Sequence, residues 1–330
     1  MTIPRVACVT VTYGPTPTLA PMLESLHRTV ADRNVDVVVA SQPDAAGESA
    51  ADVVARFPWV HHVVLHENKG FAGANNLAVS EVDCTLVAFL NPDLILTEGW
   101  LDPLEEALGD PTVTIAAPPL LTPGGEIDEA GQIMYSDGGS EPWGGSGFAA
   151  PYDRIMFSRD VDYASAACWL VRRDDFLGLG GFCTEYHPAY FEDVDFAFRA
   201  RRSGGRTRLV TKRPVVHDHA LPKPDRVGIA MSSREIFRHR QADELRSQPD
   251  RRSEDEGVER VRDHFCSDRR LEVVPRGIGV AEAERRVAEA GRWAFEHPTA
   301  RMTVHCDVYP MVEAWRRQWC PSGLELLVEP

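Results

Sequence analysis

The sequence predicts an α/β fold in which a mostly parallel sheet is flanked by helices and followed by a small α/β extension at the C-terminus. Short apolar runs rich in β-branched residues recur along the chain, and such runs are typical of strands buried on both faces of a parallel sheet. Segments with helical periodicity separate these runs. Strands that alternate with helices at this spacing indicate right-handed crossovers, and therefore a sheet covered by helices on both faces.

The individual elements follow from these patterns in chain order. Residues 6–12 (VACVTVT) form the first predicted strand, and residues 18–30 place leucine and methionine side chains on one face of a helix. The same patterns then predict strands at 35–40, 63–65 and 85–90, with helices at 50–57 and 71–79. Gly and Pro residues are frequent from 115 to 163, which predicts a long irregular segment. Beyond it we predict a strand at 164–171, a helix at 191–202 and a strand at 215–219.

Composition divides the chain into three regions. Residues 1–220 hold the main α/β unit, and residues 221–265 are polar and charge-dense, which indicates an exposed helical connector. Residues 266–330 return to an α/β rhythm and form the predicted C-terminal extension. In that extension we predict strands at 271–274, 302–306 and 324–328 and helices at 281–295 and 311–319.

Charge and cysteine content exclude several classes of protein. The net charge of −15 argues against a nucleic-acid partner or a broad anionic-membrane footprint, because both need clustered Lys and Arg. The seven cysteines are scattered without the spacing of a zinc or redox motif, which favours free thiols in a reducing compartment. No apolar run approaches the roughly 20 residues that a spanning helix needs, and the first residues lack a signal-peptide pattern. We therefore expect a cytoplasmic protein without a transmembrane segment.

A first polar cluster, Asn91-Pro92-Asp93, follows the predicted strand at 85–90 directly. Ligands in open parallel sheets bind beyond the carboxyl ends of the strands. A carboxylate at that position is suited to a hard divalent cation. An Asx-Pro turn in which Asp93 caps the next helix accounts for the same residues equally well.

A second cluster opens the predicted helix at 191–202 with Glu192, Asp193 and Asp195. Acids favour a helix N-terminus, and Asp195 can pair with Arg199 one turn further on. That structural explanation leaves Asp193 available, and a carboxylate in a half-buried cleft is a competent general base for a hydroxyl group. Both interpretations of Asp193 stay open at this point.

Two further segments could bind ligand or metal. Strand alternation places His217 and His219 on one face, so both could meet the same metal ion, although a strand-end histidine is often structural. The glycines of residues 68–76 (NKGFAGANN) open a helix and let backbone N–H groups approach an anion. This segment is neither a dinucleotide GxGxxG fingerprint nor a Walker loop.

Together these segments resemble the family 2 glycosyltransferases of GT-A fold, and especially their rhamnosyltransferase-like branch. The resemblance covers about residues 5–219 and implies a GT-A (Rossmann-like) domain. The matching segments are VTVTYG (9–14), NKGFAGANN (68–76), FLNPDLIL (89–96), ACWLVRRDDFLGLGGF (167–182), YFEDVDFAFRARRSG (190–204) and VVH (215–217).

The resemblance also implies roles for individual residues. Asp193 matches the catalytic base, Asp93 matches the metal-binding aspartate, and His217 matches a late histidine that helps to bind metal or diphosphate, with His219 an equally good candidate. The implied donor-binding positions are Thr10, Thr12, Tyr13, Asn68, Gly70, Asn76 and Asn91. The second strand usually ends in an acid that binds the base or ribose, and here Asp44 is the nearest substitute, displaced by a few positions.

The activity that this resemblance implies is an inverting, metal-dependent transfer of a sugar from a nucleoside-diphosphate donor to an acceptor hydroxyl, with Mg²⁺ or Mn²⁺ as the cation. The acceptor could be a small molecule, a glycan or a lipid-linked glycan. One alternative is a non-catalytic sugar-nucleotide-binding module. A sugar nucleotidyltransferase is less expected, because the turn after the first strand, YGPTP, carries no basic residue. Residues 266–330 do not match the family core and could bind acceptor, pack on the sheet edge or form a homodimer surface.

Overall fold

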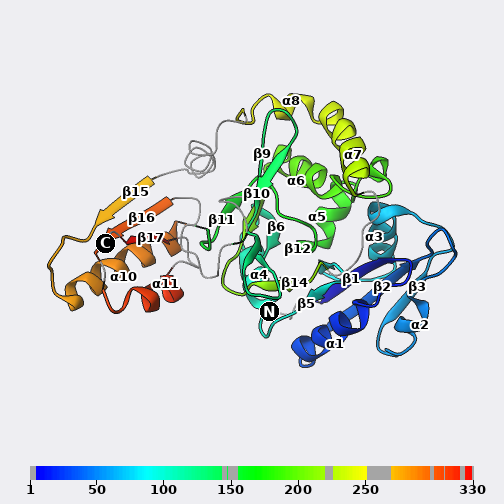
Figure 1. Ribbon diagram of the computed structural model, residues 1–330, viewed down its shortest axis with the longest axis horizontal. Coiled ribbons are helices and arrows are strands. Elements are labelled where there is room, and N and C mark those ends of the chain that lie inside the picture. The colour runs from blue at the N-terminus through cyan, green and yellow to red at the C-terminus, as the bar shows by residue number, and fades with distance from the viewer. Residues whose placement is uncertain are drawn as a thin grey trace.

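A computed structural model describes residues 5–142, 147, 155–219, 226–250, 269–297, 301–307, 309–319 and 324–328. Its largest unit is built around an eight-stranded sheet with the order β11-β13-β6-β12-β4-β1-β2-β3 (Figure 1). The strands are β1 (Val6–Tyr13), β2 (Val35–Gln42), β3 (His61–Val64), β4 (Leu86–Leu90), β6 (Val113–Ala117), β11 (Arg159–Val161), β12 (Cys168–Arg172) and β13 (Arg206–Leu209).

The sheet is mixed, with a parallel part that contains the N-terminal strands. Strand β1 pairs in parallel with β2 and β4, β2 pairs in parallel with β3, and β13 pairs in parallel with β6. Strand β12 is antiparallel to both β4 and β6, and β11 is antiparallel to β13. The predicted α/β class and the flanking of the sheet by helices are confirmed.

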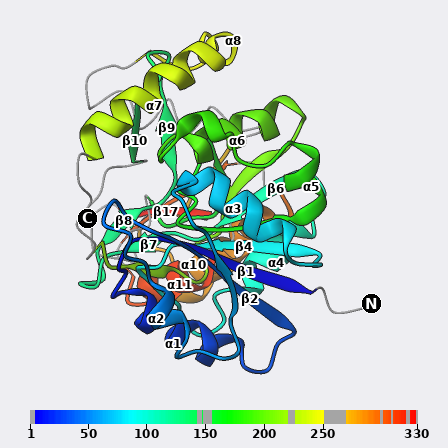
Figure 2. The same ribbon diagram turned by 90° about the vertical axis from the view of Figure 1, so that its right-hand side faces the viewer.

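Helices cover both faces of this sheet, and each face has its own apolar core. The helices are α1 (Leu19–Val30), α2 (Ala51–Val54), α3 (Gly70–Ser80), α4 (Asp102–Leu108), α5 (Arg173–Gly178) and α6 (Glu192–Arg202). Figure 2 shows α3, α5 and α6 on one side of the sheet and α1 and α2 on the other. Met22 and Leu26 of α1 lie in one core, whereas Phe176 of α5 and Phe196 of α6 lie in the core on the opposite face. Each such side chain contributes roughly 1.5–3 kcal/mol through burial.

A second, four-stranded sheet has the order β5-β14-β7-β8, and its strands β5, β7 and β14 follow β4, β6 and β13 of the first sheet along the chain. Its strands are β5 (Leu94–Ile95), β14 (Val215–His217), β7 (Leu120–Leu121) and β8 (Ile127–Glu129). Strand β14 pairs with β5 and β7, and β7 pairs with β8. These pairings bring together three segments that are far apart in the sequence.

The irregular segment predicted at 115–163 is wrong in part. It contains β7, β8, a hairpin of β9 (Gln132–Met134) and β10 (Ser140–Pro142), all of β11 and part of β6. Strands of two or three residues are too short to show a periodicity, which explains why the sequence pattern missed them. Residues 143–146 and 148–154 of the segment lie outside the described part of the chain.

The connector region contains α7 (Arg226–Arg240) and α8 (Ala242–Leu245). Helix α7 is not only an exposed connector, because its Phe237 is fully buried beside Phe198 of α6. The C-terminal region forms a parallel three-stranded sheet with its own core, which includes Val287, Val304 and Trp315. Its elements are β15 (Arg269–Val273), α10 (Val280–Glu296), β16 (Arg301–Cys306), α11 (Val312–Trp319) and β17 (Leu324–Val328). The domain boundaries at residues 220 and 265 stay a prediction.

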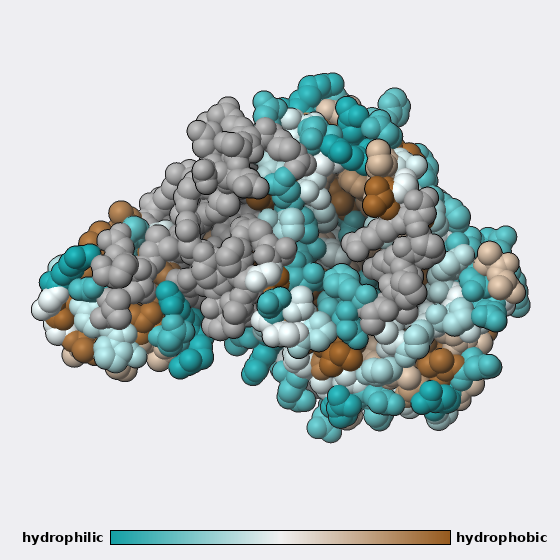
Figure 3. All heavy atoms as spheres, viewed as in Figure 1, coloured by the Kyte–Doolittle hydropathy of each residue, from teal (hydrophilic) through white to brown (hydrophobic). Residues whose placement is uncertain are grey.

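The surface is mostly hydrophilic on the face that Figure 3 presents, and the hydrophobic residues on it are scattered. Among the helices of the described residues, none is both long enough and apolar enough to cross a membrane.

Candidate active site

One half of the candidate site is a carboxylate beside an imidazole at the junction of the two sheets. Asp93 lies in the turn between β4 and β5, and His217 is the last residue of β14. The Nε2 atom of His217 lies 3.2 Å from Oδ1 of Asp93, and the two side chains are 5% and 2% exposed. The backbone fixes this pair, because the N–H of Asp218 donates to the carbonyl of Asp93 at 2.9 Å. The predicted proximity of a strand-end aspartate and a late histidine is present.

His219 lies beside His217, but not through alternation along one strand, as the sequence predicts. Strand β14 ends at His217, and His219 has a left-handed φ of 50°. Its ring centroid nevertheless lies 3.8 Å from that of His217. Ligand atoms of Asp93, His217 and His219 all lie within 4.8 Å of one another, which is compatible with one metal ion.

Asp128 is a site residue that the sequence analysis missed. Its Oδ2 atom lies 2.7 Å from Nε2 of His219 and 3.4 Å from Nδ1 of His217. It lies on the short strand β8, inside the Gly- and Pro-rich segment that was predicted to be irregular. The alternation in residues 127–129 is too brief to reveal a strand, so only the pairing of β7 with β8 places Asp128 at the site.

Charge in this half of the site is balanced among the histidines and carboxylates. Burial alone would lower the pKa of His217, but the hydrogen bonds and charges of Asp128 and Asp93 outweigh burial and raise the pKa. Burial alone would raise the pKa of Asp128, whereas His217 and His219 hold this pKa below its ordinary value. Asp128 is therefore an ionised partner of the two rings at neutral pH.

The other half of the candidate site is Asp193 in the first turn of α6. Its Oδ1 atom accepts a hydrogen bond from the N–H of Val194 at 2.8 Å, and Oδ2 accepts one from the N–H of Ala166 at 3.2 Å. Burial raises the pKa of Asp193 above its ordinary value, and these N–H groups oppose the rise. The side chain is half-buried. Within the described ranges no Lys, Arg or His forms an ion pair with Asp193, so its carboxylate is available to a ligand.

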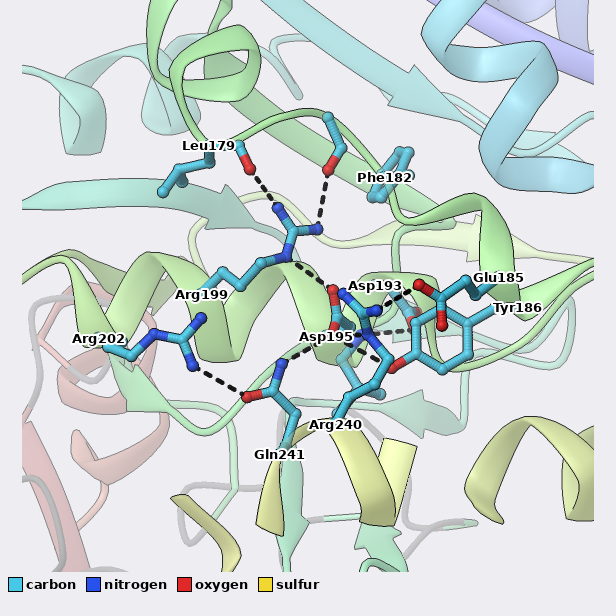
Figure 4. Close-up of polar contacts among 12 residues, drawn as sticks. Leu179, Phe182, Glu185, Tyr186, Asp193, Asp195, Arg199, Arg202, Arg240 and Gln241 are labelled. Atoms are coloured by element: carbon cyan, nitrogen blue, oxygen red, sulfur yellow. Dashed lines mark hydrogen bonds and ion pairs between the residues drawn. The ribbon is translucent and has the colours of Figure 1, made fainter. Parts of the chain in front are cut away.

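A buried polar network fixes the start of α6 and thereby Asp193. Asp195 is fully buried and accepts hydrogen bonds from Arg199 at 2.7 Å, from Gln241 at 2.7 Å and from the hydroxyl of Tyr186 at 3.1 Å. Figure 4 shows these donors converging on Asp195 from three directions, together with Arg240, whose Nε lies 3.5 Å away. The predicted pairing of Asp195 with Arg199 is confirmed. Asp195 is therefore structural, whereas Asp193 on the same turn is not committed to a cation.

Two more acids lie close to Asp193. Glu192 is 5% exposed, and burial followed by the charge of Asp193 raises its pKa well above the ordinary value. Glu129 on β8 accepts hydrogen bonds from the N–H of Ser165 at 2.7 Å and from Gln132 at 2.9 Å. Asp128, the residue before Glu129, belongs to the half of the candidate site that contains the histidines. Strand β8 therefore carries two consecutive acids, one toward each half of the candidate site.

Both halves lie at the same end of the main sheet. Strand β12 pairs with β4 so that Cys168 lies opposite Leu90. Asp93 follows the end of β4, and Ala166, which binds Asp193, precedes the start of β12. The N–H of Asn91 donates to the carbonyl of Ala167 at 2.8 Å and joins the two segments.

A pocket of about 610 Å³ lies beside the carboxyl ends of β1, β2 and β3. It is lined by Tyr13, Asp44 and Asn68 among the predicted donor-binding residues. Asp44 Oδ1 accepts hydrogen bonds from the N–H groups of Ala46 and Glu48, both at 2.9 Å, so this acid also organises its own loop.

The remaining predicted donor positions differ in their surroundings. Thr10 and Thr12 are buried in β1 and do not line this pocket. The side-chain amide of Asn76 donates to the carbonyl of Phe182 at 2.8 Å and accepts from the N–H of Phe182 at 2.9 Å, which gives Asn76 a structural role in joining α3 to that turn. Gly70 has a left-handed φ of 71°, and its N–H donates to Oδ1 of Asn68 at 2.8 Å.

The segment around Gly70 is tied to the turn that precedes α6. The N–H of Phe71 donates to the carbonyl of Pro188 at 2.8 Å, and Nε2 of His187 lies 3.1 Å from the carbonyl of Asn68. A Cβ atom on Gly70 would lie 2.8 Å from the carbonyl oxygen of Pro188, so only glycine permits this close approach. The residues before α6, Tyr190 and Phe191, both have positive φ values.

The fold is that of the GT-A glycosyltransferases. Among solved structures, the fold aligns with GalNAc-T7 in complex with UDP, GalNAc and Mn²⁺ at a TM-score of 0.59 and 12% sequence identity. The alignment covers 74% of this chain and 49% of that chain, so this chain spans about half the length of GalNAc-T7.

Sequence comparison identifies the family. The profile of glycosyl transferase family 2 matches residues 7–178, and the chain belongs to this family of nucleotide-sugar-dependent glycosyltransferases. The chain is 30% identical over 236 residues to the N-acetylglucosaminyl-diphospho-decaprenol L-rhamnosyltransferase of Mycobacterium tuberculosis, covering 64% of this chain and 75% of that protein. It is also 29% identical over 202 residues to the pre-mycofactocin glycosyltransferase of the same organism, covering 57% of this chain and 38% of that protein.

Proposed function

We propose that the protein transfers a sugar from a nucleoside-diphosphate donor to an acceptor hydroxyl with inversion at the anomeric carbon, and that Asp193 is the general base. The geometry of Asp193 is the observation that carries this proposal. Its carboxylate is half-buried, is oriented by the N–H groups of Ala166 and Val194, and belongs to a turn that Asp195 anchors. A carboxylate held in this way can take the proton of the acceptor hydroxyl while the hydroxyl oxygen attacks the anomeric carbon of the donor. General-base catalysis of this kind raises the rate by on the order of 10²–10⁴-fold.

The pocket lined by Tyr13, Asp44 and Asn68 is the proposed site of the nucleoside part of the donor. Its acid is suited to accept hydrogen bonds from a base or from ribose hydroxyls. The helix α3 begins at Gly70, two residues after Asn68 of this pocket, and the N–H groups of Gly70 and Phe71 already donate to Asn68 and Pro188. The donor diphosphate would therefore lie near the start of α3 without using these two N–H groups. The reacting sugar would then extend from the pocket toward Asp193.

The pair of Asp93 and His217 fits a divalent cation. One carboxylate oxygen and one imidazole nitrogen lie 3.2 Å apart at nearly complete burial, and a mixed oxygen and nitrogen set of this kind suits Mn²⁺ or Mg²⁺ with further oxygens from the donor. When bound, the cation supplies positive charge that stabilises the departing nucleoside diphosphate. Asp93 and His217 would hold it, and Asp193 would act separately on the acceptor.

The acceptor is proposed to be a hydroxyl group of a sugar, free or lipid-linked. The rhamnosyltransferase of Mycobacterium tuberculosis, whose name specifies a diphospho-decaprenol-linked N-acetylglucosamine acceptor, supports the lipid-linked alternative. We also propose a cytoplasmic location, which the free thiols of Cys8, Cys84, Cys168, Cys183 and Cys306 support.

The proposal is tested by replacing the base. A thermal-shift screen of UDP-, dTDP- and GDP-sugars first identifies the donor, and Asp193→Asn should then lose transfer by about 10²–10⁴-fold while donor affinity persists. The matched control is Asp174→Asn, which removes an exposed acid from the first turn of α5 and should keep full activity. Full activity of Asp193→Asn would remove Asp193 as the base. Donor binding without transfer or hydrolysis by the wild-type protein would favour a binding module.

A further inference from the structure

Asp128 contacts both histidines of the candidate metal site through one carboxylate oxygen. Its Oδ2 atom lies 2.7 Å from Nε2 of His219 and 3.4 Å from Nδ1 of His217. The carboxylate comes from β8 at the edge of the small sheet, and the histidines come from the end of β14, so the contact spans the intervening strand β7. Asp128 is 25% exposed in its side chain, whereas His217 is 5% exposed.

These contacts determine which nitrogen of each ring can bind a cation. A neutral imidazole has one N–H donor and one acceptor nitrogen, and a carboxylate selects the donor for the nitrogen that faces it. In His217 the two nitrogens face different carboxylates, because Nε2 lies 3.2 Å from Asp93 and Nδ1 lies 3.4 Å from Asp128. A cation held between Asp93 and Nε2 would leave the proton of this ring on Nδ1, which faces Asp128. In His219, Asp128 faces Nε2 at 2.7 Å, so a cation could reach this ring only through Nδ1.

The two histidines also differ in how the backbone holds them. His217 is paired in β14 and nearly buried, and its backbone register opposite Leu94 fixes its ring beside Asp93. His219 lies beyond the strand in a left-handed conformation, and its side chain is 36% exposed. An exposed ring beyond the end of a strand is held less firmly than a buried ring within a paired strand, so it is the poorer cation ligand.

We propose that Asp128 is a positioning residue that orients His217 as the cation ligand together with Asp93, and that His219 serves to hold Asp128 rather than to bind the cation. This inference rests on the proposed cation-dependent function and specifies how the site is built. Carboxylates that accept the outer N–H of a metal-binding histidine fix its tautomer and ring orientation, and their loss typically reduces metal affinity by about 10–100-fold.

The test measures Mn²⁺ binding by the full chain without donor or acceptor, by isothermal titration calorimetry and by the EPR signal of free Mn²⁺. Asp128→Ala should weaken Mn²⁺ binding by about 10–100-fold, and Asp128→Asn, which keeps one acceptor oxygen, should weaken it less. His217→Gln should abolish measurable binding. His219→Gln keeps an N–H donor for Asp128 and should retain affinity within about a few-fold. The matched control is Glu126→Gln, an exposed acid on the turn between β7 and β8.

Each outcome decides the inference. Wild-type affinity in Asp128→Ala, or a loss in His219→Gln as large as that in His217→Gln, would overturn it while the cation-dependent function stands. Absence of Mn²⁺ binding by the wild-type protein, tested also with Mg²⁺ and again with a nucleoside diphosphate present, would overturn both. Far-ultraviolet circular dichroism of every variant identifies misfolding, and the milder Asp128→Asn variant decides the question if Asp128→Ala does not fold.

Discussion

Glu129 should make the stability of the protein depend on pH, and the substitution Glu129→Gln isolates this effect. Burial raises the pKa of Glu129 from its ordinary value of 4.5 to about 7, with smaller contributions from the charges of Asp193 and Asp128. The N–H of Ser165 and the amide of Gln132 oppose the rise. Glutamine has the same shape, can accept the hydrogen bond from Ser165, and cannot ionise. The change therefore removes the charge and keeps the contact with Ser165, whereas the amide of Gln132 must turn so that its oxygen accepts from the new NH₂ group.

The direction and size of the effect follow from the two pKa values. Between pH 4.5 and about 7 the folded protein keeps a proton on Glu129 that the unfolded chain has released, so stability is lost as pH rises through this window. The difference between 4.5 and about 7 corresponds to about 3 kcal/mol at full burial. Because the side chain is half-buried and solvent screens its charge, we expect about 1–3 kcal/mol.

The assay is urea unfolding followed by tryptophan fluorescence, at several pH values from 5 to about 8.5, for the wild type and for Glu129→Gln. The variant should gain stability relative to the wild type as pH rises, and the gain should level off above about pH 8. Other acids with raised pKa values, such as Asp193, are present in both proteins and largely cancel. The exposed Glu126→Gln control should follow the wild type. Equal pH dependence in the wild type and Glu129→Gln would refute the reasoning.

Three further predictions concern the buried partner of Arg199, the proposed donor loop and the proposed cation. Asp195→Ala leaves the guanidinium of Arg199 without its buried carboxylate and should lower the free energy of unfolding by about 3–5 kcal/mol, and a loss below about 1 kcal/mol in chemical denaturation would contradict this. Gly70→Ala places a Cβ atom 2.8 Å from the carbonyl of Pro188 at a left-handed φ, so donor affinity and thermal stability should both fall. Gly73→Ala, inside α3 and without positive φ, places its Cβ 3.1 Å from that of Lys69 and should cost less. Removal of divalent cations with EDTA should stop transfer and added Mn²⁺ should restore it, and turnover that persists in demonstrably metal-free protein would exclude the cation.

The parts of the fold that were predictable from sequence are those with long enough patterns. The apolar runs of β1 and β4 and the periodicity of α1 and α6 extend over several residues, so their positions were expected to within a few residues. Asp93 and His217 follow such runs directly, which is why the sequence pointed to both. The assignment of Asp193 as base stays a prediction.

The parts that were missed depend on pairings between short or distant segments. Strand β8 has three residues and carries Asp128 and Glu129, and no local pattern distinguishes it from a loop. The network around Asp195 joins α6 to Gln241, which is 46 residues away. Neither a periodicity nor a motif reports such a contact, because the contact forms only when the sheet and α7 pack together.

The backbone hydrogen bond between Phe71 and Pro188 has a consequence for the order of events in the reaction. This bond ties the segment that opens α3 to the turn that precedes α6, so a displacement of one is transmitted to the other. A donor bound as proposed against Gly70 would therefore also restrain the turn that carries Asp193, before any acceptor arrives.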